Sequence, residues 1–391
     1  MALLSLGFLQ ALLYVLDRFS YGTFMFVFST ALLLSMLLFN PGIVPITRIA
    51  ANSSDGDRCG GMVADLLAAV TVPAALICAG AAAAVFAASA ALPADDLAWA
   101  VAGAAGVAVS TGVITLSAAF AQGRRRQLLN VSLHNGLIAL RTVSILAILL
   151  AGAASMTGVL AATAMASFAM LAIALVAIRA RQAWTPPRTA IAVLGDQGVF
   201  RQYRQNWPLL AGAALLQHGD KVILGFILPL DVLGLLALYQ QIARVLVNTT
   251  IGAIQQYLAP SLLSQTADAG RIIKASLVSM ACLAPVAGLI AAVIPWAGTA
   301  LLHGVYDLSA WPFLAICLTY ALLRASQINE LAFFRADRVR TLWLPIFGGI
   351  AAFVIAAPVL GALFGLWGAI AGLLGAAVLR YAAVLRSLRR L

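Results

Sequence analysis

The second half of this sequence repeats the first half at an offset of 212 residues. Residues that are hard to place by chance coincide at this offset: Gly22 with Gly234, Pro73 with Pro285, Asp95 with Asp307 and Trp99 with Trp311. The matches run in order along both halves, and both halves are strongly hydrophobic. A chain built from two similar hydrophobic halves is typical of membrane transporters with internal repeats.

The composition predicts an all-α polytopic membrane protein. Hydrophobic residues make up 63% of the chain and charged residues only 9%, whereas soluble proteins carry about 25% charged residues. Most of the apolar segments reach the roughly 20 residues that a helix needs to cross a bilayer. We expect about twelve transmembrane helices, at residues 2–16, 22–46, 62–91, 97–121, 128–153, 157–178, 207–228, 233–258, 272–302, 310–334, 341–361 and 364–386.

The basic residues predict the orientation of these spans. Nineteen of the 24 Lys and Arg residues lie in alternate loops or at the C-terminal end, and the loops of the opposite side carry almost none. The positive-inside rule places the nineteen in the cytoplasm, together with both termini. The net charge of +11 therefore follows from membrane topology and requires no nucleic-acid partner.

Six spans in each half make the two repeats parallel, because both halves then enter the membrane from the same side. We expect an N-terminal lobe over residues 1–190 and a C-terminal lobe over 200–391, joined by a polar linker within 179–206. The first span is shorter than its repeat partner. Two explanations stay open: the helix begins late, or the natural start lies upstream and this copy is truncated.

Several ionisable residues interrupt the apolar spans. Such groups cost at least about 2.5–3.5 kcal/mol each near the bilayer centre, so they point to function. The cations are Arg141, Lys221, Arg244 and Arg324, and the acids within spans are Asp65, Asp220 and Glu330. Arg244 shares one helix face with Gln240, Asn248 and Gln255. Asp220 and Lys221 are neighbours that point about 100° apart, so they need not pair with each other.

This excess of cations over acids favours a cavity that binds an anion, most simply a phosphate. The predicted substrate-binding residues are Arg244 and Lys221 first, then Arg141, Arg324, Asn248 and Gln255. Asp220, Glu330 and Asp65 are candidates for coupling to an ion. The alternative is that these groups only fix helix packing. None of the four cations has a charged counterpart at the offset of 212. The glycines and prolines of the scaffold are therefore repeated in both halves, whereas the buried charges are not.

Short motifs resemble those of the lipid-linked oligosaccharide flippases, which include O-antigen and exopolysaccharide exporters. They are Tyr21-Gly22, Gly42, Arg48-Ile-Ala-Ala, Asp220-Lys221-Val-Ile-Leu-Gly225, Leu233-Gly234 with Tyr239, and Pro260-Ser-Leu. The resemblance implies two six-helix lobes around a central cavity and translocation of a polyprenyl-diphosphate-linked glycan. It also implies a bacterial inner-membrane location, contact with membrane lipids, and partnership with a glycan polymerase or glycosyltransferases.

The flippases belong to the multidrug/oligosaccharidyl-lipid/polysaccharide exporter superfamily, and the main alternative is a multidrug or cation antiporter of that superfamily. Its cationic substrates would favour an excess of buried acids, which this sequence lacks. A membrane-embedded enzyme is disfavoured because the predicted outer loops are only a few residues long. The four cysteines show no metal-binding spacing and predict no disulfide, and nothing in the sequence indicates a cofactor or a metal.

Overall fold

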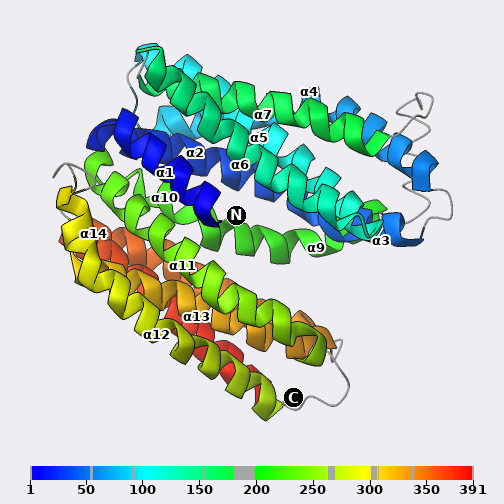
Figure 1. Ribbon diagram of the computed structural model, residues 1–391. Coiled ribbons are helices and arrows are strands. Elements are labelled where there is room, and N and C mark those ends of the chain that lie inside the picture. The colour runs from blue at the N-terminus through cyan, green and yellow to red at the C-terminus, as the bar shows by residue number, and fades with distance from the viewer. Residues whose placement is uncertain are drawn as a thin grey trace. The chain divides into compact units, whose positions relative to one another are not determined.

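The computed structural model describes residues 2–52, 56–89, 92, 94–152, 155–179, 199–262, 269–300, 306, 308–335 and 339–389. Within these ranges every regular element is a helix (Figure 1). The chain divides into two compact units. The N-terminal unit comprises mainly Leu3–Leu16 and Thr23–Val222, and the C-terminal unit comprises mainly Asp17–Gly22 and Ile223–Leu391. The expected lobe boundaries stay a prediction, because residue 190 lies outside the described ranges.

The N-terminal unit is a helical bundle arranged around one long helix, α5. Its elements are α1 (Ala2–Val15), α2 (Arg18–Phe39), a 3₁₀ turn (Asn40–Gly42), α3 (Ile43–Asn52), α4 (Gly56–Ser89), α5 (Ala94–Gly123), α6 (Gln127–Leu150), α7 (Met156–Arg179), α9 (Val199–Ala214), a π turn (Leu215–Gly219) and α10 (Asp220–Leu224). Helix α5 packs against α3, α4, α6 and α7. It is rich in Gly, Ala and Ser, and these small residues let its neighbours approach closely.

One predicted span of this unit contains an irregular turn. The sequence predicts one continuous span at 207–228, and the chain runs from α9 through a single π turn into α10 with helical backbone angles on both sides of the turn. Pro208 lies inside α9, and Gly219 ends the π turn. Because single π turns inside helices are frequent at functional sites, this turn points to Asp220 and Lys221, which follow it directly.

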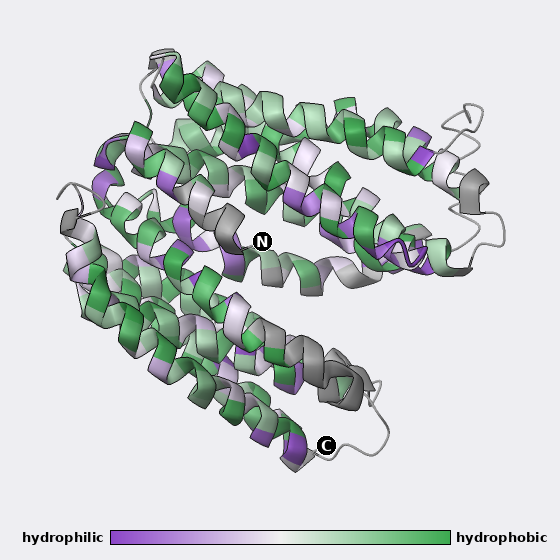
Figure 2. Cartoon of the chain, viewed as in Figure 1, coloured by the Kyte–Doolittle hydropathy of each residue, from purple (hydrophilic) through white to green (hydrophobic). Residues whose placement is uncertain are grey.

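Nine helices in the described part of the chain are long and apolar enough to cross a membrane. Large hydrophobic side chains cover their outer sides, such as Leu76 on α4 and Leu289 on α12. Figure 2 shows hydrophobic colouring along most of these two helices. Exposed apolar surface of this extent is stable only against lipid. The expectation of an all-α polytopic membrane protein is therefore confirmed.

The C-terminal unit is arranged around α13. Its elements are α11 (Leu230–Leu262), α12 (Ala269–Ala300), α13 (Ala310–Arg335), a 3₁₀ turn (Val339–Leu342) and α14 (Trp343–Leu388). Helix α13 contacts α11, α12 and α14. The repeat-matched prolines Pro73 and Pro285 lie inside α4 and α12, which are equivalent helices of the two repeats.

Element α14 is an antiparallel pair of helices rather than one long helix. Gly365 has a φ of 57° and ψ of −135°, which separates the two halves. Gly372 packs on the backbone of Ala357, and Gly349 packs on the side chain of Arg380. The contacts therefore run backwards from the turn, as in a hairpin. The two separate spans expected at 341–361 and 364–386 match these two helices.

The repeat-matched glycines Gly22 and Gly234 contact each other in the C-terminal unit. A Cβ on Gly22 would overlap the carbonyl oxygen of Leu230, and a Cβ on Gly234 would lie 2.9 Å from the carbonyl oxygen of Arg18. Arg18 and Leu230 are themselves related by the offset of 212 residues. The contact is therefore reciprocal, as expected where equivalent positions of two repeats meet.

Candidate functional site

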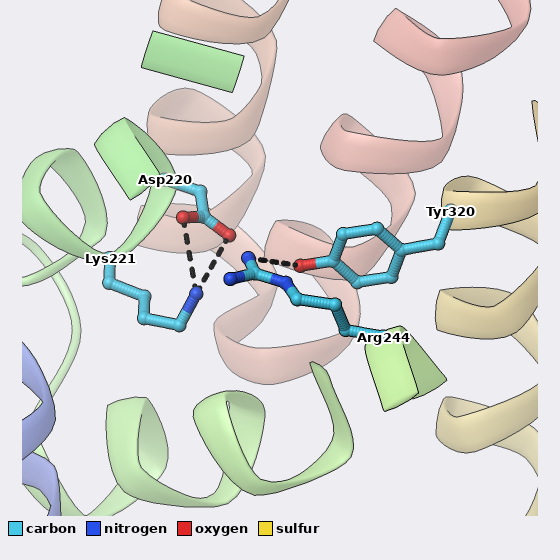
Figure 3. A network of polar contacts seen from close by, with 4 residues as sticks. All are labelled: Asp220, Lys221, Arg244 and Tyr320. Carbon is cyan, nitrogen blue, oxygen red and sulfur yellow. Dashed lines mark hydrogen bonds and ion pairs between the residues drawn. The ribbon is translucent and has the colours of Figure 1, made fainter. Parts of the chain in front are cut away.

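Two arginines of the C-terminal unit lie where α11 and α13 face each other. Arg244 of α11 donates a hydrogen bond from Nη2 to the hydroxyl oxygen of Tyr320 on α13, at 3.1 Å (Figure 3). The Arg244 guanidinium also lies 5.4 Å from the centre of the Tyr320 ring. This distance is within the range of a cation–π interaction. The tyrosine therefore fixes the position of the guanidinium while adding no opposite charge.

Arg324 of α13 makes the corresponding contact one turn further along. Its Nε and Nη2 atoms donate to Oδ1 of Asn248 at 3.1 and 2.6 Å. Its Nη1 atom donates to Oε1 of Gln327 at 2.7 Å. Both partners are neutral carboxamides, and no carboxylate of the described residues pairs with Arg324. The side chain is held in one geometry by three hydrogen bonds while its positive charge persists.

These contacts form a ladder along one face of each helix. Arg244 and Asn248 are four residues apart on α11, and Tyr320 and Arg324 are four residues apart on α13. Such residues lie one above the other on a helix. The second contact, between Asn248 and Arg324, lies four residues further toward the C-terminus on both helices than the first. Helices α11 and α13 therefore run parallel here, as the predicted topology requires. Gln255, predicted to belong to the same site, has a side chain outside the described part of the structure.

Lys221 pairs with Asp220, which corrects the expectation that these neighbours need not pair. The Lys221 ammonium nitrogen lies 3.3 and 3.4 Å from the two carboxylate oxygens of Asp220, and both residues belong to the N-terminal unit (Figure 3). The lysine is only 2% exposed. Its four methylene groups let the ammonium reach back to the preceding residue, and burial strengthens the attraction between the charges.

Arg141 lies inside the N-terminal unit, in contact with α2, α5 and α7. Its Nε atom donates to Ser167 Oγ at 2.8 Å, and its Nη2 atom donates to Thr111 Oγ1 at 2.8 Å. The guanidinium carbon lies 5.4 Å from the centre of the Phe28 ring. Only 5% of the residue is exposed. Each of these contacts of the cation is with a neutral group.

Glu330 and Asp65, two of the three ion-coupling candidates, take part in ion pairs within their own units. Glu330 accepts a hydrogen bond from Arg380 at 2.7 Å, and both side chains are buried. Asp65 lies 3.5 Å from Nη2 of Arg179. Glu330 follows Arg324 and Gln327 on α13, but its side chain pairs with Arg380 of α14.

Sequence reasoning missed Thr111 and Ser167, the hydroxyl partners of Arg141, and Arg380, the basic partner of Glu330. Thr111 and Ser167 lie in alanine-rich helices whose composition indicates packing alone. Isolated Ser and Thr residues are common in transmembrane helices, so no local pattern distinguishes these two. Arg380 could have been found: it is counted with the basic residues of the C-terminal end, although it lies within the span expected at 364–386.

The fold is that of a membrane transporter. The inward-closed lipid II flippase MurJ matches with a TM-score of 0.73 at 7% identity, covering 99% of this chain and 85% of that one. The MATE multidrug transporter DinF-BH matches with a TM-score of 0.59 at 14% identity, covering 100% of this chain and 92% of that one. At these identities the likeness concerns the fold alone.

The sequence itself shows the family. The family model described as polysaccharide biosynthesis protein matches residues 1–266, which is about two thirds of the chain. The chain therefore belongs to the polysaccharide biosynthesis protein family, as the resemblance of its motifs indicated. No curated protein matches its sequence.

Proposed function

We propose that this protein moves an oligosaccharide linked to a polyprenyl diphosphate across the bacterial inner membrane, for surface polysaccharides such as O-antigen. Membership of the polysaccharide biosynthesis family and the transporter fold support this function. The two repeats would alternate access to the two sides of the membrane. In this proposal both termini lie in the cytoplasm, and a glycan polymerase or glycosyltransferases act on the same lipid-linked substrate.

The observation that carries the proposal is the charge of Arg324. Three hydrogen bonds to Asn248 and Gln327 hold its guanidinium on a membrane-spanning helix, but none of them neutralises it. Arg244 lies one turn away on the facing helix. A guanidinium binds phosphate oxygens in a bidentate manner, and two of them suit a diphosphate. We assign Arg324 and Arg244 to the diphosphate, and Asn248 to positioning Arg324.

Lys221 and Asp220 have a different proposed role. Their buried ion pair would be a strong competitor for phosphate, so binding at Lys221 would require the pair to separate. Separation of an ion pair by substrate is one way to couple the carboxylate of Asp220 to a proton or cation. Lys221 remains a proposed phosphate ligand, and Asp220 a proposed coupling residue, on this basis.

A multidrug or cation antiporter is the second candidate. The similarity to the DinF-BH transporter favours it, because that solved structure shares this fold. A cationic substrate, however, would be repelled by Arg324, whose hydrogen-bond partners are neutral. The two functions differ in the sign of the charge that the site prefers.

The test replaces Asn248 by aspartate, which exchanges an amide nitrogen for an oxygen. Asn248→Asp places a carboxylate within hydrogen-bond distance of Arg324 and neutralises it. We expect a large loss of surface glycan in a complemented deletion strain, normalised to membrane protein, with unchanged or higher thermal stability. Arg324→Gln should lower export about 10–100-fold, because charge-assisted hydrogen bonds contribute roughly 1.5–3 kcal/mol. Arg324→Lys should keep part of the activity.

The matched control is Arg386→Gln, which removes an exposed arginine of α14. It should leave export unchanged. Normal export from both Asn248→Asp and Arg324→Gln would show that the ladder serves packing only. If the deletion strain keeps its glycan but accumulates a cationic dye, the antiporter is the correct function.

A further inference from the structure

A second buried arginine, Arg141, lies within the N-terminal unit, and the proposed flippase function does not use it. Arg141 lies on the membrane-spanning helix α6 and is 5% exposed. Its contacts come from three other helices: Phe28 of α2, Thr111 of α5 and Ser167 of α7. Four helices of one unit therefore enclose this guanidinium.

The charge of Arg141 has no protein counterion among the described residues. Its hydrogen-bond partners are two hydroxyl groups, and its ring contact is the apolar Phe28. Taking an arginine out of water without an opposite charge is costly in a low-dielectric interior. A buried charge of this kind is stabilised when an ion of opposite sign binds beside it.

Two hydrogen-bond donors at this site are left over. Ser167 Oγ accepts from Arg141 and donates to the carbonyl oxygen of Thr163 at 2.6 Å, so its proton is used. Thr111 Oγ1 accepts from Arg141, and no described acceptor takes its proton. Nη1 of Arg141 likewise makes no hydrogen bond to a described residue. Two unused donors beside an unneutralised positive charge suit a ligand that accepts hydrogen bonds and is negatively charged, which is an anion.

The burial of Arg141 and the aromatic rings around it favour a small anion. Phe28 stacks on Phe24 with ring centres 5.4 Å apart and contacts Phe8 of α1 at 6.2 Å. These rings form an apolar cover beside the guanidinium. A lipid-linked diphosphate carries a bulky glycan and cannot enter so enclosed a site, although the sequence alone predicts Arg141 as one of its ligands.

We propose that Arg141 and Thr111 bind a small inorganic anion inside the N-terminal unit, chloride being the ion of this class that cells supply in abundance. The Nη1 group and the Thr111 hydroxyl donate to the ion, and its charge neutralises the guanidinium. Ser167 positions Arg141 by accepting from Nε. The site is independent of the diphosphate-binding ladder, which lies in the other unit.

The test measures the thermal unfolding of the purified full-length protein in detergent. Sodium chloride is compared with sodium gluconate at equal ionic strength, because gluconate is too large for the site. A ligand that binds only the folded state raises the Tm in a saturable way. We expect a rise of about 2–4 °C when chloride is tenfold above its Kd, and bromide should act like chloride.

Two variants test the assigned residues, and one serves as control. Thr111→Val removes one donor but keeps the charge and shape, so it should weaken the chloride response several-fold. Arg141→Met should abolish it. Arg324→Gln, which removes a cation of the other unit, should respond to chloride like the wild type. An equal Tm in chloride and gluconate, or an unchanged chloride response in Thr111→Val, would overturn the proposal even if Arg141→Met fails to fold.

Discussion

The buried ion pair between Glu330 and Arg380 offers the sharpest test of structural against transport roles. The sequence makes Glu330 a candidate for coupling transport to an ion, and in the structure its carboxylate accepts a hydrogen bond from Arg380 at 2.7 Å. Gly349 lies against the arginine stem, where a Cβ would approach Arg380 Cβ to 3.0 Å, so the facing helix is shaped around this side chain. The Nε atom of Arg380 has no hydrogen-bond partner among the described residues.

The cost of breaking this pair follows from its burial. Removing one partner of a buried ion pair leaves an uncompensated charge and costs about 3–5 kcal/mol. Glu330→Gln keeps an acceptor oxygen and should fall at the lower end of this range. Glu330→Leu removes every acceptor and should fall at the upper end. Replacing both partners, as in Glu330→Leu with Arg380→Met, should be nearly neutral because apolar groups of similar volume fill the space.

Thermal unfolding in detergent and surface-glycan export are measured on the same variants. The single variants should lose on the order of 10 °C in Tm, and export should fall with protein abundance. The double variant should recover both quantities. If the double variant is stable but cannot export glycan, Glu330 has a role in transport, and the assignment to packing is wrong.

Three further predictions follow from the packing and the topology. Gly372→Ala should lower stability by about 1–3 kcal/mol, because its Cβ would overlap Ala357. Gly375→Ala, whose Cβ would have nothing within 4 Å, should be neutral or stabilise by up to ~1 kcal/mol. Equal Tm values for these two variants would refute the hairpin packing. Gly22→Ala should lower the Tm more than Gly234→Ala, because a Cβ on Gly22 would overlap a carbonyl oxygen, whereas a Cβ on Gly234 would lie 2.9 Å from one; equal Tm values would contradict this. In a background without native cysteines, an impermeant thiol reagent should label a cysteine at position 94 but not at 188 in intact cells, and labelling at 188 would reverse the proposed orientation.

The repeat and the spans could be predicted because they depend on periodic, local properties. An apolar stretch must satisfy its backbone hydrogen bonds internally, so it becomes a helix wherever it is long enough. The span expected at 97–121 corresponds to α5 (Ala94–Gly123), and that expected at 310–334 corresponds to α13 (Ala310–Arg335). The segment from α9 to α10 is also helical over most of the span expected at 207–228, but hydropathy does not indicate the π turn within it.

The candidate site could be predicted only as separate faces. Spacing of four residues placed Arg244 with Asn248 on one helix face, and the structure joins this pair to Tyr320 and Arg324 of α13. The packing of α11 against α13 decides that the face with Arg244 contacts the face with Arg324. Helix periodicity within one segment gives no information about this packing. The same limit explains Lys221: helix geometry gives the direction of its side chain from the axis, but not how far back that flexible chain reaches.

The structure explains why the charges differ between the repeats. The counterpart of Arg324 at the offset of 212 is Gly112, where even a Cβ would overlap the ring of Phe39, so no arginine fits there. The counterpart of Arg141 is Phe353, which is 1% exposed in the C-terminal unit. Each cation therefore occupies a place that its repeat fills with close packing. The backbone contact between Gly22 and Gly234 is reciprocal, so the two repeats have kept similar backbones at these positions. The buried cations differ: Arg141 occurs only in the first repeat and Arg324 only in the second. The proposed roles follow this difference: Arg324 of the C-terminal unit is assigned to the substrate phosphate, and Arg141 of the N-terminal unit to a small ion.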